Sequence, residues 1–468
     1  MGPVDAAVRA ALADFAAAAV PPRIAIALSG GRDSMVLLDA AVRAAVMRPI
    51  ELSAVHVHHG LSDHADDWAA FCAAACRERG VPLTVRRVAV ARRGGESLEA
   101  AARAARYAAF AALDVDGVAL AHHADDQAET LLLQLMRGAG PHGIAAMARG
   151  TPARASGPAL LRPLLAVRRS AIDAYIGAHG LAHVEDDSNA DVALRRNRLR
   201  VDIVPRLAAA FPGYPETLVR AAAHQAEAAQ LLDDLAALDA RDGIGPALPG
   251  TAPADGDVLD RRLLTALPAA RARNLLRWFL RRQGLRAPSA ARLAAMLQQL
   301  VAAANDARVA IAHDGATVGV HRGWIAIHGP PATGWAAEWR GEPALALPHG
   351  TLLFSPIAAG REGIAATALD GPPLVARAAR GGERLRLAAD RPRRALTDLW
   401  REAGIPPWAR SAWPLLFCGD ELVAVPGLGV AAPFVARGGA AGYAADWRPA
   451  AARPQSLTDV NRATDSTG

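Results

Sequence analysis

The stretch that decides the fold is Ser29-Gly30-Gly31-Arg32-Asp33-Ser34, which follows the apolar run Ile24 to Leu28 and precedes a helical pattern from Met35 to Met47. A strand, a glycine-rich turn and a helix in this order let backbone N–H groups and the helix N-terminus converge on one anion. The paired glycines allow the chain to approach a phosphate closely, and Ser29 and Ser34 add hydroxyl groups. The stretch has neither the Gly-Lys-Ser/Thr of a Walker loop nor the GxGxxG of a dinucleotide fold. We therefore expect a phosphate-binding loop of another type.

Short β-rich runs alternate with helical segments around this loop, which is typical of a parallel sheet with crossover helices. The expected strands are 24–28, 52–57, 83–88 and 118–121, and the expected helices are 35–47, 66–79, 97–113, 124–136 and 169–179. We therefore predict an α/β domain of the Rossmann-like, parallel-sheet class over residues 1–213.

A second domain is expected over residues 214–335. Helical patterns cover 218–238 and 261–300, and a short β-like passage follows at 318–327. This pattern predicts a mostly helical domain, and residues 329–341 resemble a linker after it.

The remaining chain predicts a small α+β C-terminal domain over residues 345–443. It alternates short strands with one helix at 394–403, which Gly404 closes. The polar tail 444–468 lacks periodicity, so we expect it to be disordered.

Composition limits the class of protein. The chain has 468 residues, a net charge of +6 and a pI of about 9.9, and all 52 of its basic residues are arginine. This charge favours a polyanionic partner, although a general drift in composition accounts for the lack of lysine. Three cysteines in so long a chain argue against a disulfide framework. With no apolar run of membrane-spanning length, we expect a cytoplasmic protein in a reducing compartment.

Polar side chains gather after the strand at 118–121, in the run Ala121-His122-His123-Ala124-Asp125-Asp126-Gln127-Ala128-Glu129-Thr130. Asp126 and Glu129 are three residues apart, so their carboxylates share one helical face near the carboxyl end of a strand. They suit an ammonium group or Mg²⁺, and capping of the helix by acidic residues is the alternative. A zinc site at the histidines is disfavoured because no further ligand cluster follows.

In this position SGGxDS resembles the N-type ATP pyrophosphatase, or PP-loop, family, whose members cleave ATP between the α and β phosphates. Further motifs resemble the tRNA(Ile)-lysidine synthetases within it. These motifs are His56-Val57-His58-His59-Gly60-Leu61, the helix 99–107, the run 121–130, Arg162-Pro163-Leu164-Leu165, Glu185-Asp186-Asp187-Ser188-Asn189 and Arg196-Asn197-Arg198, followed later by 381–385 and 405–410.

The resemblance implies an ATP-dependent ligase that joins free L-lysine to the 2-carbon of the wobble cytidine in the CAU anticodon of an isoleucine tRNA. The cytosine oxygen attacks the α-phosphate of ATP, and the lysine amine then displaces AMP. ATP and Mg²⁺ are the expected cofactors, because magnesium neutralises phosphate charge. The expected partners are this tRNA and lysine, with no membrane, and the sequence leaves a homodimer open.

Roles follow for single residues. We expect catalytic roles for Asp33, Asp126, Glu129, Arg103 and His122, and magnesium at Asp33 and Asp126. We expect contacts to ATP from Ser29, Gly30, Gly31, Arg32, Asp33, Ser34, His56 and Arg196. Three assignments have alternatives: a structural role for the His56–His58 pair, an ordinary surface position for Arg103 and Arg106, and an anticodon contact for Arg196.

The chain departs from the family at Ser62, where a basic residue is frequent, and at Leu396-Thr397-Asp398, where lysines are usual. The second departure leaves phosphate contacts in the C-terminal domain to Arg391, Arg393 and Arg394. Three other functions compete. A tRNA thiolase needs grouped cysteines, which the later motifs lack; a small-molecule amidating ligase fits a basic C-terminal domain poorly; and a non-catalytic RNA-binding protein does not explain the retained carboxylates.

Overall fold

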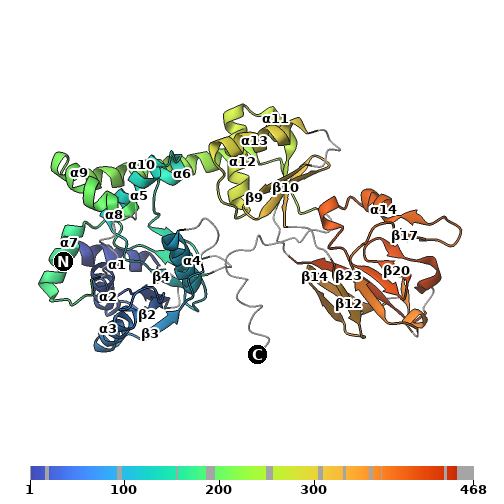
Figure 1. Ribbon diagram of the computed structural model, residues 1–468, viewed down its shortest axis with the longest axis horizontal. Helices are drawn as coiled ribbons and strands as arrows, with labels where there is room; N and C mark the ends of the chain where they lie inside the picture. The colour runs from blue at the N-terminus through green and yellow to red at the C-terminus, as the bar shows by residue number, and fades with distance from the viewer. Residues whose placement is uncertain are drawn as a thin grey trace. The chain divides into compact units, whose positions relative to one another are not determined.

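The computed structural model describes residues 2–15, 21–91, 97–153, 157–185, 195–248, 257–303, 309–329, 334–357, 362–369, 371–436 and 440–450. The chain divides into two compact units, Met1–Leu231 and Leu232–Gly468. Figure 1 labels the helices and strands of both. The division falls within helix α10 (Tyr214–Asp239), so it does not test the predicted boundary at residue 213. The predicted division into three domains stays a prediction.

The first unit contains a six-stranded sheet in the order β3-β2-β1-β4-β6-β5. Its parallel strands are β1 (Arg23–Ala27), β2 (Glu51–His58), β3 (Leu83–Arg87), β4 (Gly117–Ala119) and β6 (Ala159–Leu161), and the two-residue β5 (Gly150–Thr151) pairs antiparallel at the edge. The predicted parallel α/β domain is confirmed, with this short antiparallel addition.

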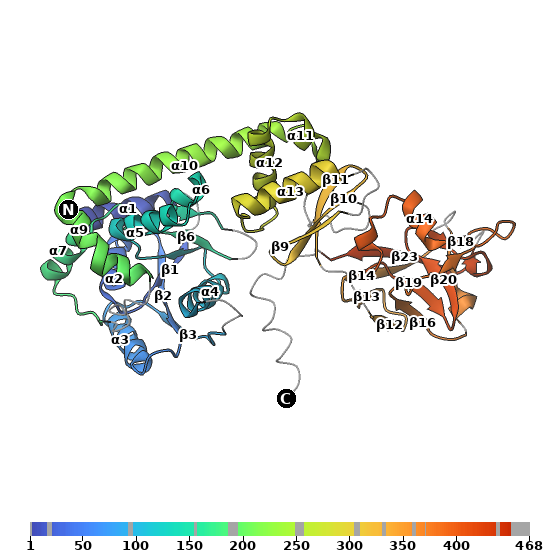
Figure 2. The same ribbon diagram turned by 45° about the horizontal axis from the view of Figure 1, so that its top comes forward.

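Helices cover both faces of this sheet because β1 buries both of its sides. Ile24 and Ile26 face a core with α1, α2, α3 and α7, whereas Ala25 faces a core with Phe110 of α4. Figure 2 shows α4 on the opposite side of the sheet from α1 and α2. The helices of this part are α1 (Pro3–Phe15), α2 (Arg32–Ala45), α3 (Ala65–Glu78), α4 (Leu98–Ala111), α5 (Ala124–Met136), α6 (Pro141–Ile144) and α7 (Arg169–His179).

The order of the strands places two polar segments at one edge of the sheet. β1 pairs with both β2 and β4, and parallel strands have their carboxyl ends at the same edge. The loop after β1 and the run between β4 and α5 therefore emerge side by side. The chain later continues through α8 (Arg195–Arg198), a π-helical turn (Leu199–Ile203), α9 (Val204–Ala210) and α10.

The second unit begins with three shorter helices and a five-stranded antiparallel sheet. The helices are α11 (Arg261–Ala266), α12 (Ala269–Arg282) and α13 (Ala290–Ala302); the strands, in sheet order, are β7 (Ile244–Gly245), β8 (Val258–Asp260), β11 (Trp324–His328), β10 (Ala316–His321) and β9 (Ala310–His313). The expectation of a mostly helical domain is thus only partly right. Strands of two and three residues are too short to show alternation in the sequence.

The C-terminal part is built mainly from antiparallel strands. One sheet has β12 (Ala336–Trp339), β16 (Leu374–Arg377), β19 (Leu415–Cys418), β20 (Glu421–Val425) and β21 (Gly429–Val430); the other has β13 (Ala344–Leu347), β14 (Gly350–Pro356), β23 (Gly442–Pro449), β15 (Gly363–Ala365) and β22 (Val435–Ala436). The hairpin β17 (Arg384–Leu385) and β18 (Arg394–Ala395) leads into the helix α14 (Leu396–Glu402).

The predicted helix 394–403 is confirmed as α14, although it begins at Leu396, after β18. Two other expectations for this part were wrong. The predicted linker 329–341 contains strand β12. The predicted disordered tail starts too early, because residues 444–449 lie in β23 and pair with β14. Alternate residues of β23, Ala445 and Trp447, pack on the core, so the polar appearance of the strand comes from its other face. The rest of that predicted tail, 451–468, lies outside the described residues.

Candidate active site

The loop after β1 is closed tightly against its surroundings. Gly30 has a φ of +86°, and a Cβ atom there would lie 3.0 Å from Val184 Cγ2 and 3.2 Å from Cys72 Sγ. The Gly30 carbonyl accepts a hydrogen bond from the Val184 N–H (3.0 Å). A side chain at position 30 would therefore be excluded by both conformation and space.

Two serines hold the shape of the loop. Ser34 Oγ donates to the Gly31 carbonyl (2.8 Å) and accepts from the Ser29 N–H (3.2 Å). Ser29 Oγ lies 3.1 Å from Ser34 Oγ and accepts from the Gly31 N–H (3.3 Å). Helix α2 begins directly after, and the first N–H groups of a helix lack acceptors within it. The loop thus presents the anion-binding geometry that the sequence predicts.

The Arg32 side chain is engaged away from the loop. Its Nη1 donates to Asp173 Oδ1 on α7 (2.9 Å), and its Nη2 lies 3.9 Å from Glu185 Oε1. Of Arg32, the backbone N–H is therefore the group best placed for a phosphate, and the guanidinium ties the start of α2 to α7.

Asp33 lies beside the start of α5. Its Oδ2 is 3.7 Å from His123 Nε2, which lies 3.5 Å from Asp126 Oδ2. Asp33 Oδ1 is buried and has no hydrogen-bond partner among the described residues. Burial raises the pKa of Asp33 above its ordinary value, against the opposing charge of His123. A buried acceptor without a donor is a costly arrangement that a cation would relieve.

Asp126 and Glu129 are held by two arginines from the segment after residue 194. Arg196 Nε donates to Glu129 Oε2 (2.9 Å); Arg200 Nε donates to Glu129 Oε1 (2.6 Å) and its Nη2 to Asp126 Oδ1 (2.7 Å). Burial raises the pKa of Asp126, but the charges of His123, Arg196 and Arg200 outweigh it, and the pKa lies below its ordinary value. Arg200 was missed in the sequence, although its spacing of four from Arg196 places both on one helical face.

Two further predicted residues border this cluster. Burial lowers the pKa of His122 to about 4, so its ring is uncharged at neutral pH, and its Nδ1 has no hydrogen-bond partner in the described part of the chain. The charge of Arg103 contributes to that lowering. Arg103 Nη2 donates to the Tyr107 hydroxyl (3.1 Å), and the guanidinium lies 4.9 Å from the Tyr107 ring centroid.

The ring of His56 has a supporting position. Its Nδ1 lies 2.9 Å from the Leu28 carbonyl and 3.5 Å from Cys72 Sγ, and the residue is buried. His56 thereby ties β2 to the last residue before the phosphate loop. It shares a strand face with His58, whose ring centroid is 6.5 Å away.

Metal ligands are sparse within the ranges that the structure describes. No group of three or more His, Cys, Asp or Glu side chains is arranged there to hold a metal ion. Magnesium bound to a nucleotide needs only one or two carboxylates beside phosphate oxygens. Asp33 fits such a role through its unpartnered oxygen. Both oxygens of Asp126 already accept hydrogen bonds, from Arg200 and from the His123 N–H (3.1 Å).

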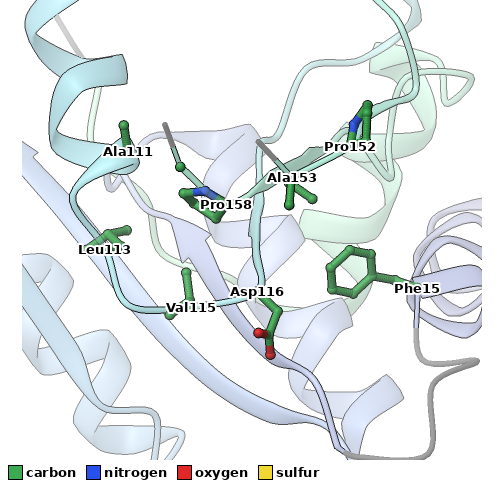
Figure 3. Close-up of a pocket in the computed structure, with 10 residues that line it drawn as sticks. Phe15, Ala111, Leu113, Val115, Asp116, Pro152, Ala153 and Pro158 are labelled. Carbon is green, nitrogen blue, oxygen red and sulfur yellow. The ribbon is translucent and has the colours of Figure 1, made fainter. Parts of the chain in front are cut away.

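A separate pocket of about 620 Å³ lies near the amino ends of β4 and β6, and Figure 3 shows its lining. Phe15, Pro152 and Pro158 contribute apolar surface, and Asp116 accepts a hydrogen bond from the Arg23 N–H (2.7 Å). Asp116 is the one charged residue of its lining, and no serine, histidine or arginine contributes to it among the described residues.

Comparison with known families agrees with this geometry. A PP-loop domain model matches residues 4–207, and models of the TilS substrate binding domain and the TilS substrate C-terminal domain match residues 259–326 and 374–447. The fold and the loop therefore define a protein of the PP-loop ATP-binding class. The two later matches narrow this class, and the chain belongs to the tRNA(Ile)-lysidine synthase family.

Curated relatives match over nearly the whole chain. The tRNA(Ile)-lysidine synthase of Azoarcus sp. (strain BH72) is 43% identical over 441 residues, covering 94% of this chain and 95% of the relative. The tRNA(Ile)-lysidine synthase of Ralstonia nicotianae is 45% identical over 461 residues, covering 94% and 96%. None of the helices in the described ranges is long and apolar enough to span a membrane.

Proposed function

We propose that the protein joins free L-lysine to the 2-carbon of the wobble cytidine in the CAU anticodon of an isoleucine tRNA, using ATP and releasing pyrophosphate and AMP. The product, lysidine, pairs with adenine, so the tRNA reads AUA in place of AUG. The observation that carries this proposal is the identity of 43–45% over 94% of the chain, which includes both regions beyond the PP-loop domain.

The first step is attack of the cytosine 2-oxygen on the α-phosphate of ATP. The loop from Ser29 to Ser34 and the N-terminus of α2 would hold the phosphates through backbone N–H groups. Magnesium would neutralise the leaving pyrophosphate, with Asp33 as its protein ligand. Arg103 and the neutral His122 border the same site. Both side chains would donate hydrogen bonds to the reacting groups.

The second step is attack of the lysine amine on the activated ring carbon, with AMP as the leaving group. An ammonium group must first be bound and must lose a proton, because its ordinary pKa is about 10.4. Asp126 and Glu129 are the carboxylates suited to hold it, since both lie on the first two turns of α5, and His123 at the start of this helix contacts Asp33 as well as Asp126. The predicted contact of Arg196 with ATP or with the anticodon is replaced in our proposal by its observed pairing with Glu129.

The thiolase alternative conflicts with the state of the cysteines. Cys72, Cys76 and Cys418 are all buried, and burial raises the pKa of Cys72 to about 12. A thiol of this kind is a poor carrier of sulfur, because the thiolate is the reactive form.

The test is to supply the purified protein with ATP, magnesium, labelled lysine and total bacterial tRNA. We expect label in an isoleucine tRNA with a CAU anticodon and none in methionine tRNAs carrying the same three bases. Mass spectrometry of the labelled nucleoside should show lysidine. Sulfur incorporation, or ATP turnover on a small molecule without any labelled tRNA, would refute the proposal.

A further inference from the structure

The two carboxylates proposed to hold lysine are already occupied by the protein's own guanidinium groups. Each of their four oxygens accepts one hydrogen bond: Glu129 from Arg196 and Arg200, and Asp126 from Arg200 and the His123 N–H. The Glu129 side chain is 7% exposed, so these pairs are largely shielded from water. A cationic substrate therefore meets carboxylates whose positions for bidentate binding of a guanidinium are already occupied by Arg196 and Arg200.

We propose that Arg196 and Arg200 determine the selectivity of this site for lysine over arginine by filling the positions that a substrate guanidinium would need. This inference rests on the proposed function and names the residues that set its amino-acid specificity. Arg200 acts through Asp126 and Glu129, so it is a positioning residue and is not itself catalytic.

The physical basis is the difference between the two cations. A guanidinium binds carboxylates as a planar fork that needs two suitably placed oxygens. Arg200 already bridges Glu129 Oε1 and Asp126 Oδ1, and Arg196 holds Glu129 Oε2 while its Nη2 donates to Thr130 Oγ1 (3.1 Å). An ammonium is a compact charge that can use the second lone pair of a single oxygen.

Space around the two carboxylates favours a small cation. Asp126 and Glu129 provide two carboxylates, and Arg196 and Arg200 bind them through charge-assisted hydrogen bonds. Asp33 is close enough to influence the pKa of Arg200, so the three carboxylates act on one region. A compact ammonium can approach these oxygens beside the two bound guanidinium groups, whereas a third guanidinium would have to displace one of them.

The position of these arginines agrees with a dedicated role. Arg196 lies in α8 and Arg200 in the π-helical turn Leu199–Ile203 that continues from it. Isolated π-helical turns are rare and are frequent at functional sites.

The experiment compares the wild type with Arg200→Ala, Arg200→Lys and the control Arg206→Ala, an exposed residue of α9. Each full-length protein is given ATP, magnesium, the isoleucine tRNA and labelled lysine, and free arginine is titrated against lysine incorporation. We expect wild type and Arg206→Ala to tolerate a large excess of arginine. In both Arg200 variants arginine should inhibit competitively, at concentrations at least ~10-fold lower. The apparent KM for lysine is measured in parallel, so that inhibition by arginine is expressed relative to lysine binding in each variant.

Arg200→Lys keeps a positive charge near the carboxylates without the fork, so it separates selectivity from folding if Arg200→Ala is unstable. Equal sensitivity to arginine in the wild type and in Arg200→Lys would overturn the inference. The inference would also be overturned if kcat fell while the inhibition constant of arginine, divided by the KM of lysine, stayed as in the wild type. That result is expected of a residue with only a structural role. A wild type that incorporates no lysine would overturn the proposed function itself, which distinguishes the two failures.

Discussion

Arginines serve two opposite purposes in this chain. In the first unit, Arg196 and Arg200 are 24% and 29% exposed, and their guanidinium groups are bound to two buried carboxylates. In the hairpin of β17 and β18, Arg391 and Arg393 are exposed and form no ion pair with the residues that the structure describes. Paired, shielded charges fix the geometry of a small site, whereas open charges remain available to a polyanion.

The comparison shows why the net charge of +6 carried little information by itself. Charges that neutralise one another inside the first unit do not contribute to attraction at a distance. Charges on the hairpin do, because side chains that lack a carboxylate partner can each neutralise a phosphate. The predicted binding of tRNA by the C-terminal domain therefore depends on where the unpaired arginines lie, and not on the net charge of the whole chain.

The largest effect is expected at Asp33, whose buried oxygen lacks a partner. Asp33→Ala should fold and lose nearly all tRNA-dependent pyrophosphate release, because several kcal/mol of transition-state stabilisation are lost with a magnesium-linked carboxylate. Asp14→Ala, at an exposed position of α1, is the control. Release at the wild-type rate in Asp33→Ala would remove Asp33 from the catalytic site.

A smaller effect is expected from Glu129→Gln, which removes the negative charge beside Arg196 and Arg200 but keeps the size of the side chain. The apparent KM for lysine should rise or the second step should slow, while adenylation and tRNA binding stay nearly intact. Loss of two charge-assisted pairs should also lower the free energy of unfolding by about 2 kcal/mol. Pyrophosphate release, lysine incorporation and thermal unfolding measure these three quantities separately. A fall in tRNA affinity alone would show that Glu129 has been misassigned.

The first unit was the more predictable half of the molecule. Helix α5 begins at Ala124 and ends at Met136 as expected, since acidic first-turn residues mark its start. The apolar run of β1, buried on both faces, makes this strand visible in the sequence. The pairing of Arg200 with Glu129 and Asp126 was not found, because these partners are 71 and 74 residues away and its spacing from Arg196 shows only a shared helical face.

The sheet of β7 to β11 was predicted only in part: the β-like passage 318–327 coincides with β10 and β11, but β9 was missed despite a usable signal. Asp314 and Gly315 have φ values of 51° and 78° between β9 and β10, and Arg322 and Gly323 have 51° and 83° between β10 and β11. Positive φ at both central residues is the geometry of a two-residue type I′ hairpin turn. The Asp-Gly pair is a known marker of this turn. The partner strands β7 and β8 gave no comparable sign.

A moderate effect is expected when Arg391, Arg393 and Arg394 of the hairpin are neutralised together. tRNA binding should weaken, and the slope of log affinity against log salt should flatten by roughly one unit per lost phosphate contact. Arg394 is partly committed, because its Nη1 donates to Glu402 Oε2 (3.0 Å). The slope should therefore flatten by about two units in the triple variant, because Arg394 contributes little. An unchanged slope would assign these arginines to another role, and the lysine KM, measured at saturating tRNA, should not change.

The smallest expected effect tests whether pairing decides how an arginine is used. Glu402→Gln removes the carboxylate partner of Arg394 while both positions remain exposed. Freed from this pair, Arg394 should add a phosphate contact, so tRNA affinity should rise by less than about threefold and the salt slope should steepen by up to about one unit. The double variant Glu402→Gln, Arg394→Ala should lose this gain, because the contact comes from Arg394. If the single and double variants bind tRNA with the same salt dependence, Arg394 does not face the tRNA, and the contrast between paired and open arginines applies only to Arg391 and Arg393.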